Sequence, residues 1–351
     1  MATTFVVPDG RVAMAATLYT GNGSTQSVSN AVNTVSFQPD FVWIKDRTAT
    51  YGNVLFDVIR GVSKYVVSNS TATEVTDANS LSAFTSTGFS VGTSVVSNTN
   101  ADTYVGWNWK AGGTAVSNTA GTITSSVSAN PTAGFSVVTY TGNGSATASY
   151  GHGLGTTPQF IISKSRNNAD ADAGYWDVYH VSLASQYALF LQGTNAAFLA
   201  TSIWASAPTS TVVNIGNGSG VNAGSSATYV AYCWAPVAGY SAFGSYTGNG
   251  SADGPFIYTG FRPRFVLIKA TTAASNWVII DSSRNPANVA MNQLYANLTD
   301  TEYTAYIFGD LNSNGVKIRG NATLSDNYNT SGATYIYACF AENPLRYSNA
   351  R

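Results

Sequence analysis

Charged residues are scarce in this sequence. They make up 9% of the 351 residues, and the formal net charge at pH 7 is −1, whereas about a quarter of the residues are charged in an average globular domain. Binding to nucleic acid or to an anionic membrane surface needs clustered positive charge. The composition gives no electrostatic basis for either, and we expect the protein to bind no nucleic acid.

Signals for export and membrane insertion are absent from the sequence as well. The first five residues have no basic start leading into an apolar segment, which a signal peptide would need. No stretch approaches the roughly 20 apolar residues that span a bilayer as a helix. We therefore expect synthesis in the cytoplasm of the producing cell and no membrane insertion.

Side chains that usually carry catalysis or hold metals are few. The sequence has two histidines, two cysteines and three glutamates: His152, His180, Cys233, Cys339, Glu74, Glu302 and Glu342. They do not cluster with the spacing of a metal site, and no Gly-x-Ser-x-Gly turn or glycosidase-like pair of acids occurs. We predict that the protein is not an enzyme and has no metal or cofactor, and that both cysteines are reduced thiols on equivalent strands.

The sequence does contain an internal repeat. The hexapeptide Tyr-Thr-Gly-Asn-Gly-Ser occurs at residues 19–24, 140–145 and 246–251, so the copies begin 121 and 106 residues apart. These intervals fit a whole small domain of roughly 100 residues. Both glycines permit a positive φ, and we interpret the hexapeptide as a tight turn between strands, formed by Gly21 and Gly23, Gly142 and Gly144, and Gly248 and Gly250.

Further landmarks follow each hexapeptide in the same order. A proline precedes an apolar run that ends, six residues later, at Lys45, Lys164 or Lys269. An aspartate then precedes a basic or imidazole side chain by three positions, in the pairs Asp57 and Arg60, Asp177 and His180, and Asp281 and Arg284. Each copy closes on a Thr-Tyr strand rich in aromatic residues. We interpret the aspartates as structural landmarks, in ion pairs or turns, because an active site would rarely be kept in three copies with His in place of Arg.

The pattern predicts an all-β fold with three tandem antiparallel β-sandwiches of jelly-roll or lectin-like type. Short strands alternate with Gly/Asn turns, and β-branched and aromatic residues are abundant while glutamate is rare, as is typical of sandwiches. The post-proline runs are apolar at consecutive positions, which predicts strands buried on both faces. We place an N-terminal arm at 1–12, the sandwiches at 13–110, 134–237 and 238–351, and a linker of small residues at 111–133.

Few side chains are candidates for ligand binding. The Gly-Asn-Gly turns resemble phosphate loops only superficially, because neither a helix nor a Lys-Ser/Thr pair follows them. His152 lies in a Gly-His-Gly-Leu-Gly segment that the other copies lack, and Trp204 lies in a segment that ends at a proline. We take these two residues as the binding candidates, with core packing as the alternative for the tryptophan.

One family resemblance follows from these motifs. The run Ala-Gly-Phe-Ser-Val-Val-Thr-Tyr-Thr-Gly-Asn-Gly at 133–144, followed by Gly-His-Gly-Leu-Gly at 151–155, resembles a domain common in predicted tail-fibre and other virion proteins of tailed phages. Residues 244–256 and the ending at 340–344 look like further parts of this family. The resemblance implies a phage structural component with a lectin-like β-sandwich, and it supplies no catalytic residues.

We therefore expect a virion structural protein, and first a tail-fibre or tail-adhesin component that contacts host-surface glycans. The alternative is a head decoration protein whose three copies mimic a trimer at a quasi-threefold position. A capsule depolymerase would need clustered acids that the sequence does not show. The expected partners are other tail or capsid proteins and a host-surface glycan, with the chain acting as a homo-oligomer or as part of a larger assembly.

Overall fold

The computed structural model describes residues 6–7, 9–167, 174–184, 186–224, 226–320 and 328–342. Over these residues the protein is all-β, as the sequence predicts, and its named strands pair only in antiparallel ladders. Helical structure there is limited to the short turns η1 (Gly10–Val12), α1 (Val95–Asn98) and α2 (Ser219–Asn222). The first five residues, the Pro8 position and residues 343–351, which belong to the predicted arm and ending, lie outside the described residues.

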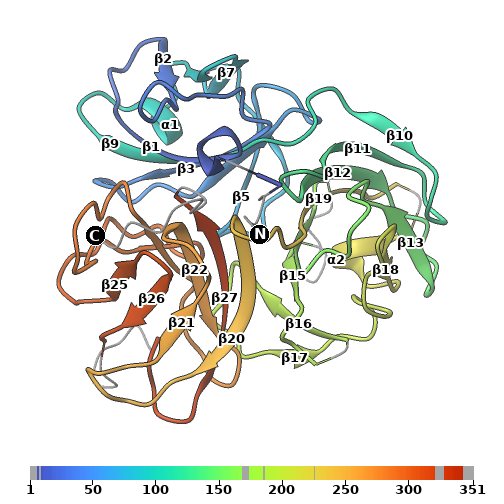
Figure 1. Ribbon diagram of the computed structural model, residues 1–351. Helices are drawn as coiled ribbons and strands as arrows, with labels where there is room; N and C mark the ends of the chain where they lie inside the picture. Colours follow the sequence, from blue (N-terminus) through green and yellow to red (C-terminus); the bar gives the residue numbers. More distant parts are fainter. Residues whose placement is uncertain are drawn as a thin grey trace.

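Repeat 1, residues 13–110, contributes one large and one small sheet (Figure 1). The large sheet has the order β1 (Met14–Thr20), β9 (Thr103–Trp109), β3 (Phe41–Asp46), β4 (Val54–Asp57), β5 (Lys64–Val67) and β6 (Val75–Thr76). The small sheet has the order β2 (Gln26–Ser29), β8 (Gly88–Val91) and β7 (Leu81–Thr85).

Repeat 2, residues 134–237, follows the same plan. Its large sheet has the order β10 (Val116–Asn118), β11 (Ser125–Asn130), β12 (Phe135–Thr141), β19 (Thr228–Trp234), β14 (Phe160–Ser165), β15 (Trp176–His180), β16 (Tyr187–Phe190) and β17 (Phe198–Leu199). The small sheet pairs β13 (Ala148–Gly151) with β18 (Val212–Ile215). The prediction of a plain linker at 111–133 is corrected, because this segment supplies β10 and β11 to the edge of the sheet.

Repeat 3, residues 238–351, repeats the strand order again. Its large sheet has the order β20 (Ser241–Thr247), β27 (Thr334–Ala341), β22 (Pro263–Ala270), β23 (Val278–Asp281) and β24 (Leu294–Tyr295). The small sheet has the order β21 (Phe256–Tyr258), β26 (Gly315–Ile318) and β25 (Gly309–Asn312). In all three repeats the closing strand lies between the strand of the hexapeptide and the post-proline strand.

The post-proline strands β3, β14 and β22 are buried along their whole length. In repeat 1, Val42 and Ile44 on one face of β3 pack with Phe89 of the small sheet. On the opposite face, Phe41 and Trp43 belong to a second and larger cluster. This explains the consecutive apolar positions, since a strand with two buried faces needs apolar side chains in both directions.

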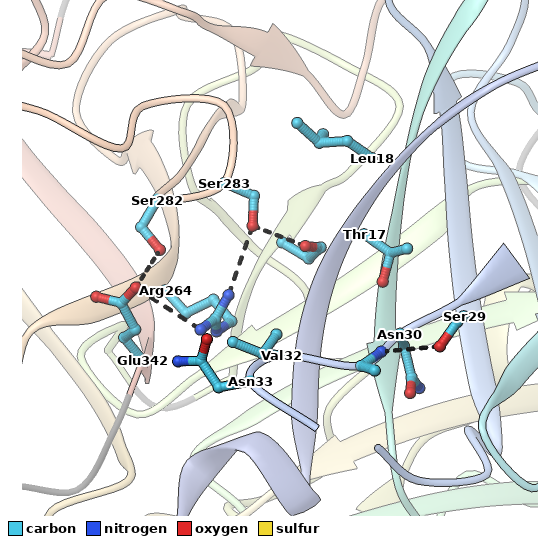
Figure 2. A pocket seen from close by; sticks show the side chains of 12 residues that line it. Thr17, Leu18, Ser29, Asn30, Val32, Asn33, Arg264, Ser282, Ser283 and Glu342 are labelled. Carbon is cyan, nitrogen blue, oxygen red and sulfur yellow. Dashed lines mark hydrogen bonds and ion pairs between the residues drawn. The ribbon is translucent and has the colours of Figure 1, made fainter. Parts of the chain in front are cut away.

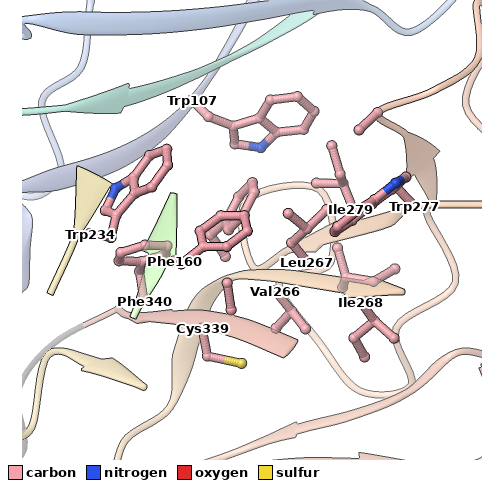
Figure 3. Close-up of a cluster of buried hydrophobic side chains, with 14 of the residues drawn as sticks. Trp107, Phe160, Trp234, Val266, Leu267, Ile268, Trp277, Ile279, Cys339 and Phe340 are labelled. Carbon is pink, nitrogen blue, oxygen red and sulfur yellow. The ribbon is translucent and has the colours of Figure 1, made fainter. Parts of the chain in front are cut away.

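The larger cluster is a core shared by all three repeats (Figure 3). Trp109, Trp234 and Phe340, which hold the same position on the three closing strands, meet there with ring centroids 5.9, 5.5 and 6.3 Å apart for the pairs 109–234, 109–340 and 234–340. Three equivalent side chains in mutual contact define a pseudo-threefold axis. The three large sheets therefore surround one interior, and the repeats do not follow one another as a rod.

The described part of the N-terminal arm packs against this interior. Val7 is 2% exposed and belongs to the shared core. Asp9 and Arg11 form an ion pair at 2.8 Å, and the Asp9 side chain caps the turn η1 by accepting from the Arg11 amide. Residues 7 and 9–12 are thus part of the body of the protein and not a free extension.

Candidate functional site

The repeated hexapeptide is one half of a buried hydrogen-bond cluster, here called the asparagine clasp. In repeat 1, Asn98 accepts at Oδ1 from the Asn22 amide at 2.9 Å, and its Nδ2 donates to the carbonyls of Ser24 and Gly92, both at 2.6 Å. Asn222 and Asn329 make the same set of contacts in the other repeats. Since these contacts satisfy the turn within each repeat, the Gly-Asn-Gly segments have a structural use.

The two glycines of each hexapeptide meet different requirements. A Cβ at Gly21, Gly142 or Gly248 would lie 2.0–2.3 Å from a backbone carbonyl oxygen. The second glycine of each copy has a positive φ, +67° at Gly23, +71° at Gly144 and +68° at Gly250. Glycine is thus required once for close backbone approach and once for backbone conformation.

Asp57 and Asp281 lie at two boundaries between repeats. The Oδ2 atom of Asp57 accepts from Nε of Arg60 at 2.5 Å and from the hydroxyl of Tyr232 in repeat 2 at 2.9 Å. Asp281 accepts in the same way from Arg284 at 2.6 Å and from the indole of Trp107 in repeat 1 at 3.0 Å. Both ion pairs have no exposed side-chain surface, so they are structural and out of reach of a ligand.

A glutamate extends each of these two pairs across the boundary. Glu74 bridges Arg60 to Arg166 of repeat 2, and Glu302 bridges Arg284 to Arg47 of repeat 1. Two of the three glutamates of the chain are therefore used in equivalent inter-repeat networks. The pKa of Glu74 is lowered, since the two arginines outweigh the opposing effect of burial.

Asp177 is not the counterpart of these aspartates, and the alignment from sequence is corrected here. In the strand register, Phe41 lies opposite Asp57 and Phe265 opposite Asp281, but Phe160 lies opposite His180. The equivalent of Asp57 is thus His180, three residues beyond Asp177. Aspartate 177 takes the position of Val54 in repeat 1, so the predicted aspartate–histidine pair is not the same structure as the two aspartate–arginine pairs.

His180 lies at the third boundary, between repeats 2 and 3, and crosses it by a hydrogen bond of a neutral imidazole instead of an ion pair. Its Nδ1 accepts from the Ser182 amide at 3.1 Å, so Nε2 carries the proton and donates to the carbonyl of Tyr337 in repeat 3 at 3.0 Å. Burial lowers the pKa of His180 to about 4, which keeps the ring neutral at pH 7. At this boundary Leu183 takes the position that Arg60 and Arg284 have at the other two. The residue that would bond the position of His180 from the closing strand is Ala338, where the other two boundaries have Trp107 and Tyr232.

The lysines that end the post-proline runs join the same boundaries. Each ammonium donates to a backbone carbonyl of the neighbouring repeat: Lys45 to Thr299, Lys164 to Thr71 and Lys269 to Thr194, at 3.1, 3.0 and 3.2 Å. Burial lowers the pKa of Lys45 and Lys164 to about 8 and that of Lys269 to about 7. These side chains are 0% exposed and serve the packing of the repeats.

The two binding candidates from the sequence lie in the interior. His152 is 0% exposed; it accepts at Nδ1 from the Leu154 amide at 3.2 Å, so its Nε2 donates to the Thr209 carbonyl, also at 3.2 Å. Trp204 is 1% exposed and packs edge-on against Tyr179 in the core of repeat 2. Neither side chain reaches a surface where it could contact a large ligand.

Asp177 lies in a cavity of repeat 2. Trp176 and Val178 face the shared core, so the side chain between them points to the opposite face of β15. There Asp177, 1% exposed, lines a cavity of about 330 Å³ together with Tyr175 and Phe198. The cavity is small, and a single carboxylate does not make a metal site.

A larger pocket of about 440 Å³ lies at the boundary between repeats 1 and 3, here called the β1–β22 pocket (Figure 2). Hydroxyl, amide and charged side chains line most of it: Thr17, Ser29, Asn30, Asn33, Arg264, Ser282, Ser283 and Glu342. Ala16, Leu18, Ala31 and Val32 supply its apolar wall. Its volume is in the range of small-ligand sites, about 300–1,000 Å³.

Arg264 is the buried cation of this pocket. The residue is 3% exposed, and its contacts are long, since Nη1 lies 3.5 Å from Oγ of Ser283 and Nη2 lies 3.7 Å from Oε1 of Glu342. Its Nε has no hydrogen-bond partner within the described part of the chain. Burial lowers the pKa of Arg264, although a guanidinium remains charged at neutral pH.

Glu342 is the other charged residue that lines the pocket, and Arg262 lies beside it. Glu342 is held mainly by the half-exposed Arg262, and it also accepts from Oγ of Ser282 at 3.4 Å. Oγ of Ser283 donates to the Ala16 carbonyl at 2.7 Å and so ties repeat 3 to β1. Arg264 and Glu342 are thus the charged residues among those that line the pocket, and Arg262 draws the glutamate away from Arg264.

Sequence reasoning missed Arg264, although a signal was present. The residue after the landmark proline is Asp40 in repeat 1, Gln159 in repeat 2 and Arg264 in repeat 3. A position that changes charge among repeats, within a motif that is otherwise kept, indicates a local use. The site itself could not be read from the sequence, because its two walls are more than 200 residues apart in the chain.

A second shallow pocket, of about 340 Å³, lies on repeat 2. It is lined by Arg166 and by hydroxyl side chains: Ser117, Thr124, Ser125, Ser126, Thr139, Tyr140, Thr141 and Thr228. Part of this wall comes from β10 and β11, which repeats 1 and 3 lack in their described residues. Its arginine already forms an ion pair with Glu74. This pocket therefore offers hydroxyl groups to a ligand, while its one arginine is already engaged.

Across the described ranges, no group of three or more His, Cys, Asp or Glu side chains is arranged to hold a metal ion. Within the same ranges, no helix has the length and apolar character to cross a bilayer.

The fold and the site define an all-β protein in which three repeats surround a common core and carry polar surface pockets. The chain belongs to the family described as "Domain of unknown function (DUF7483)", whose sequence model matches residues 12–344 and so spans all three repeats. No curated protein and no solved structure matches the chain.

Proposed function

We propose that this chain is a phage virion structural protein, a tail-fibre or adhesin component that contacts a host-surface glycan in the β1–β22 pocket. The phage context rests on the sequence resemblance of the segments at 133–158 and 244–263. The glycan ligand is proposed from the pocket, because its hydroxyl, amide and charged side chains can donate to and accept from the hydroxyl groups of a saccharide. That pocket, which Arg264, Ser282, Thr17 and Asn33 line together, is the observation that carries the proposal.

We further propose that each repeat is a lectin-like sandwich built into a larger whole. In repeat 1, Val28 and Phe89 of the small sheet pack on Val42 of the large sheet. In repeat 2, Tyr150 and Val213 of the small sheet pack on Ile161. Loops at the outer ends of such sandwiches are available for recognition, as binding residues are commonly carried on loops over a rigid scaffold.

The experiment is binding of the purified full chain to a panel of surface oligosaccharides. Ala31 lines the pocket from an exposed loop, so Ala31→Trp fills the pocket with little effect on the fold. Ala146 is an exposed loop alanine of repeat 2 outside this pocket, and Ala146→Trp is the matched control. We expect binding by the wild type and Ala146→Trp and loss of binding in Ala31→Trp; binding unchanged in Ala31→Trp would reject the pocket.

A head decoration protein is the second candidate, and one observation favours it. The contact of Trp109, Trp234 and Phe340 on a pseudo-threefold axis makes one chain resemble a trimer, a shape that fits a quasi-threefold position of a shell. Antibody labelling of virions that contain the protein separates the two candidates. Label at the tail supports the adhesin, and label over the head supports decoration.

A further inference from the structure

The β1–β22 pocket contains an arginine that the fold does not require. The strand register places Arg264 at the position held by Asp40 in repeat 1 and Gln159 in repeat 2, since each accepts at its carbonyl from the residue after the β4, β15 or β23 strand. A guanidinium at this site is thus a special feature of repeat 3. It is buried at an energetic cost, because the charge leaves water and its ion pair with Glu342 is long, at 3.7 Å.

The donors of Arg264 are only partly used. Its Nε has no partner among the described residues, and its two terminal nitrogens lie 3.5 and 3.7 Å from oxygen atoms. A guanidinium prefers two parallel, charge-assisted bonds of about 2.7–2.9 Å to a planar carboxylate. Glu342 does not supply this arrangement, since its closest partner is Arg262.

We propose that the β1–β22 pocket binds an acidic saccharide, with the carboxylate of a uronic-acid-type unit on Arg264. The hydroxyl of Ser283 lies 3.5 Å from the guanidinium, and Asn33 lies beside it (Figure 2). Thr17 lies on the far side of the pocket and offers a hydroxyl to the sugar ring. Leu18, 41% exposed, offers an apolar contact for the ring. This inference rests on the proposed function and names the chemical class of its ligand.

Glu342 is the internal competitor of that ligand. Its carboxylate interacts with both Arg262 and Arg264, so a bound carboxylate would have to share these arginines with it. Removing the negative charge at this position therefore favours an anionic ligand. Two substitutions thus have opposite predicted effects on one affinity, which a general loss of structure cannot produce.

The test is calorimetric titration of the full chain with uronic-acid oligosaccharides and with their neutral counterparts of the same linkage. Arg264→Gln installs the side chain that repeat 2 carries at the equivalent position, Gln159, so the fold has a precedent for it. We expect Arg264→Gln to weaken uronate binding by about tenfold to a hundredfold, the factor for a bond to a charged group. Glu342→Gln should strengthen it, and neutral sugars should respond to neither change.

The outcomes separate this inference from the proposed function. Equal affinity for acidic and neutral sugars, unchanged in Arg264→Gln, would overturn the acidic ligand and leave glycan binding in place. Absence of binding to every saccharide by the wild type would overturn both. Uronate binding that weakens in Arg264→Gln, strengthens in Glu342→Gln and falls at high salt, where charge pairs are screened, supports the inference.

Discussion

One glycine and one asparagine residue hold the hexapeptide turn of each repeat in place. Gly142 has no room for a Cβ, because that atom would lie 2.3 Å from the carbonyl oxygen of Ala223. Asn222 then holds the same turn through its amide contacts to the carbonyls of Ser145 and Gly216. The hexapeptide was visible in the sequence, but its partner asparagine was not, since it lies 76–80 residues further along the chain and only the fold brings the two together.

We predict that Gly142→Ala lowers the free energy of unfolding by about 2–3 kcal/mol, the cost of forcing extra volume into a packed site. The measurement is urea denaturation followed by tryptophan fluorescence. Gly224→Ala is the control in the same repeat, because a Cβ there meets no atom within 4 Å, and it should change the free energy by less than about 1 kcal/mol. Equal effects of the two substitutions would contradict the close-approach argument.

Strands and their pairing decide which polar groups meet across the repeats. Tyr232 on β19 donates to Asp57 on β4 of another repeat, a contact of 175 residues in sequence separation. The apolar pattern of the post-proline strands predicts that they are buried on both faces, and this is confirmed. It does not predict which repeat covers the inner face, because apolar packing is not directional and an apolar face can be buried by any other apolar segment.

We predict that Tyr232→Phe destabilises the protein by about 1.5–3 kcal/mol, the usual cost of losing a hydrogen bond to a charged group. The buried Oδ2 atom of Asp57 would then keep Nε of Arg60, while Oδ1 still accepts from the amides of Ile59 and Arg60. Tyr240→Phe is the control, because the Tyr240 hydroxyl is buried with no hydrogen-bond partner in the described residues, and it should be neutral or stabilising. Chemical denaturation of both variants measures the difference, and a Tyr240→Phe effect as large as that of Tyr232→Phe would contradict it.

The whole molecule places many titratable groups in one dry interior, so its stability depends on pH. Burial lowers the pKa of His180 to about 4 and that of Lys269 to about 7, and it raises the pKa of Cys233 to about 12. A histidine or lysine whose pKa is lowered in the folded state binds fewer protons there than in the unfolded chain. The free energy of unfolding therefore rises with pH between the folded and unfolded pKa values of that group. A thiol with a raised pKa has the opposite effect at alkaline pH.

We therefore predict a stability maximum at about pH 8–9, from the ordinary pKa values of these groups in an unfolded chain. Stability should fall below pH 6.5 as the unfolded histidines become protonated, and it should fall above pH 9 as unfolded thiols and tyrosines ionise. Urea denaturation across this range measures it. Lys269→Met should flatten the rise between pH 7 and 9, and an unchanged rise would show that the buried lysines are not its source.

The sequence by itself determined the all-β class, the threefold repetition, the strands buried on both faces and the scarcity of catalytic side chains. These follow from local patterns, that is from turn residues, apolar periodicity and composition. Only the tertiary structure showed that Asp177 is displaced from the Asp57 position, that residues 111–133 add strands, and that Arg264 faces Thr17 across a pocket. The physical reason is that strand register and contacts between repeats depend on packing among residues far apart in the chain, which no local pattern encodes.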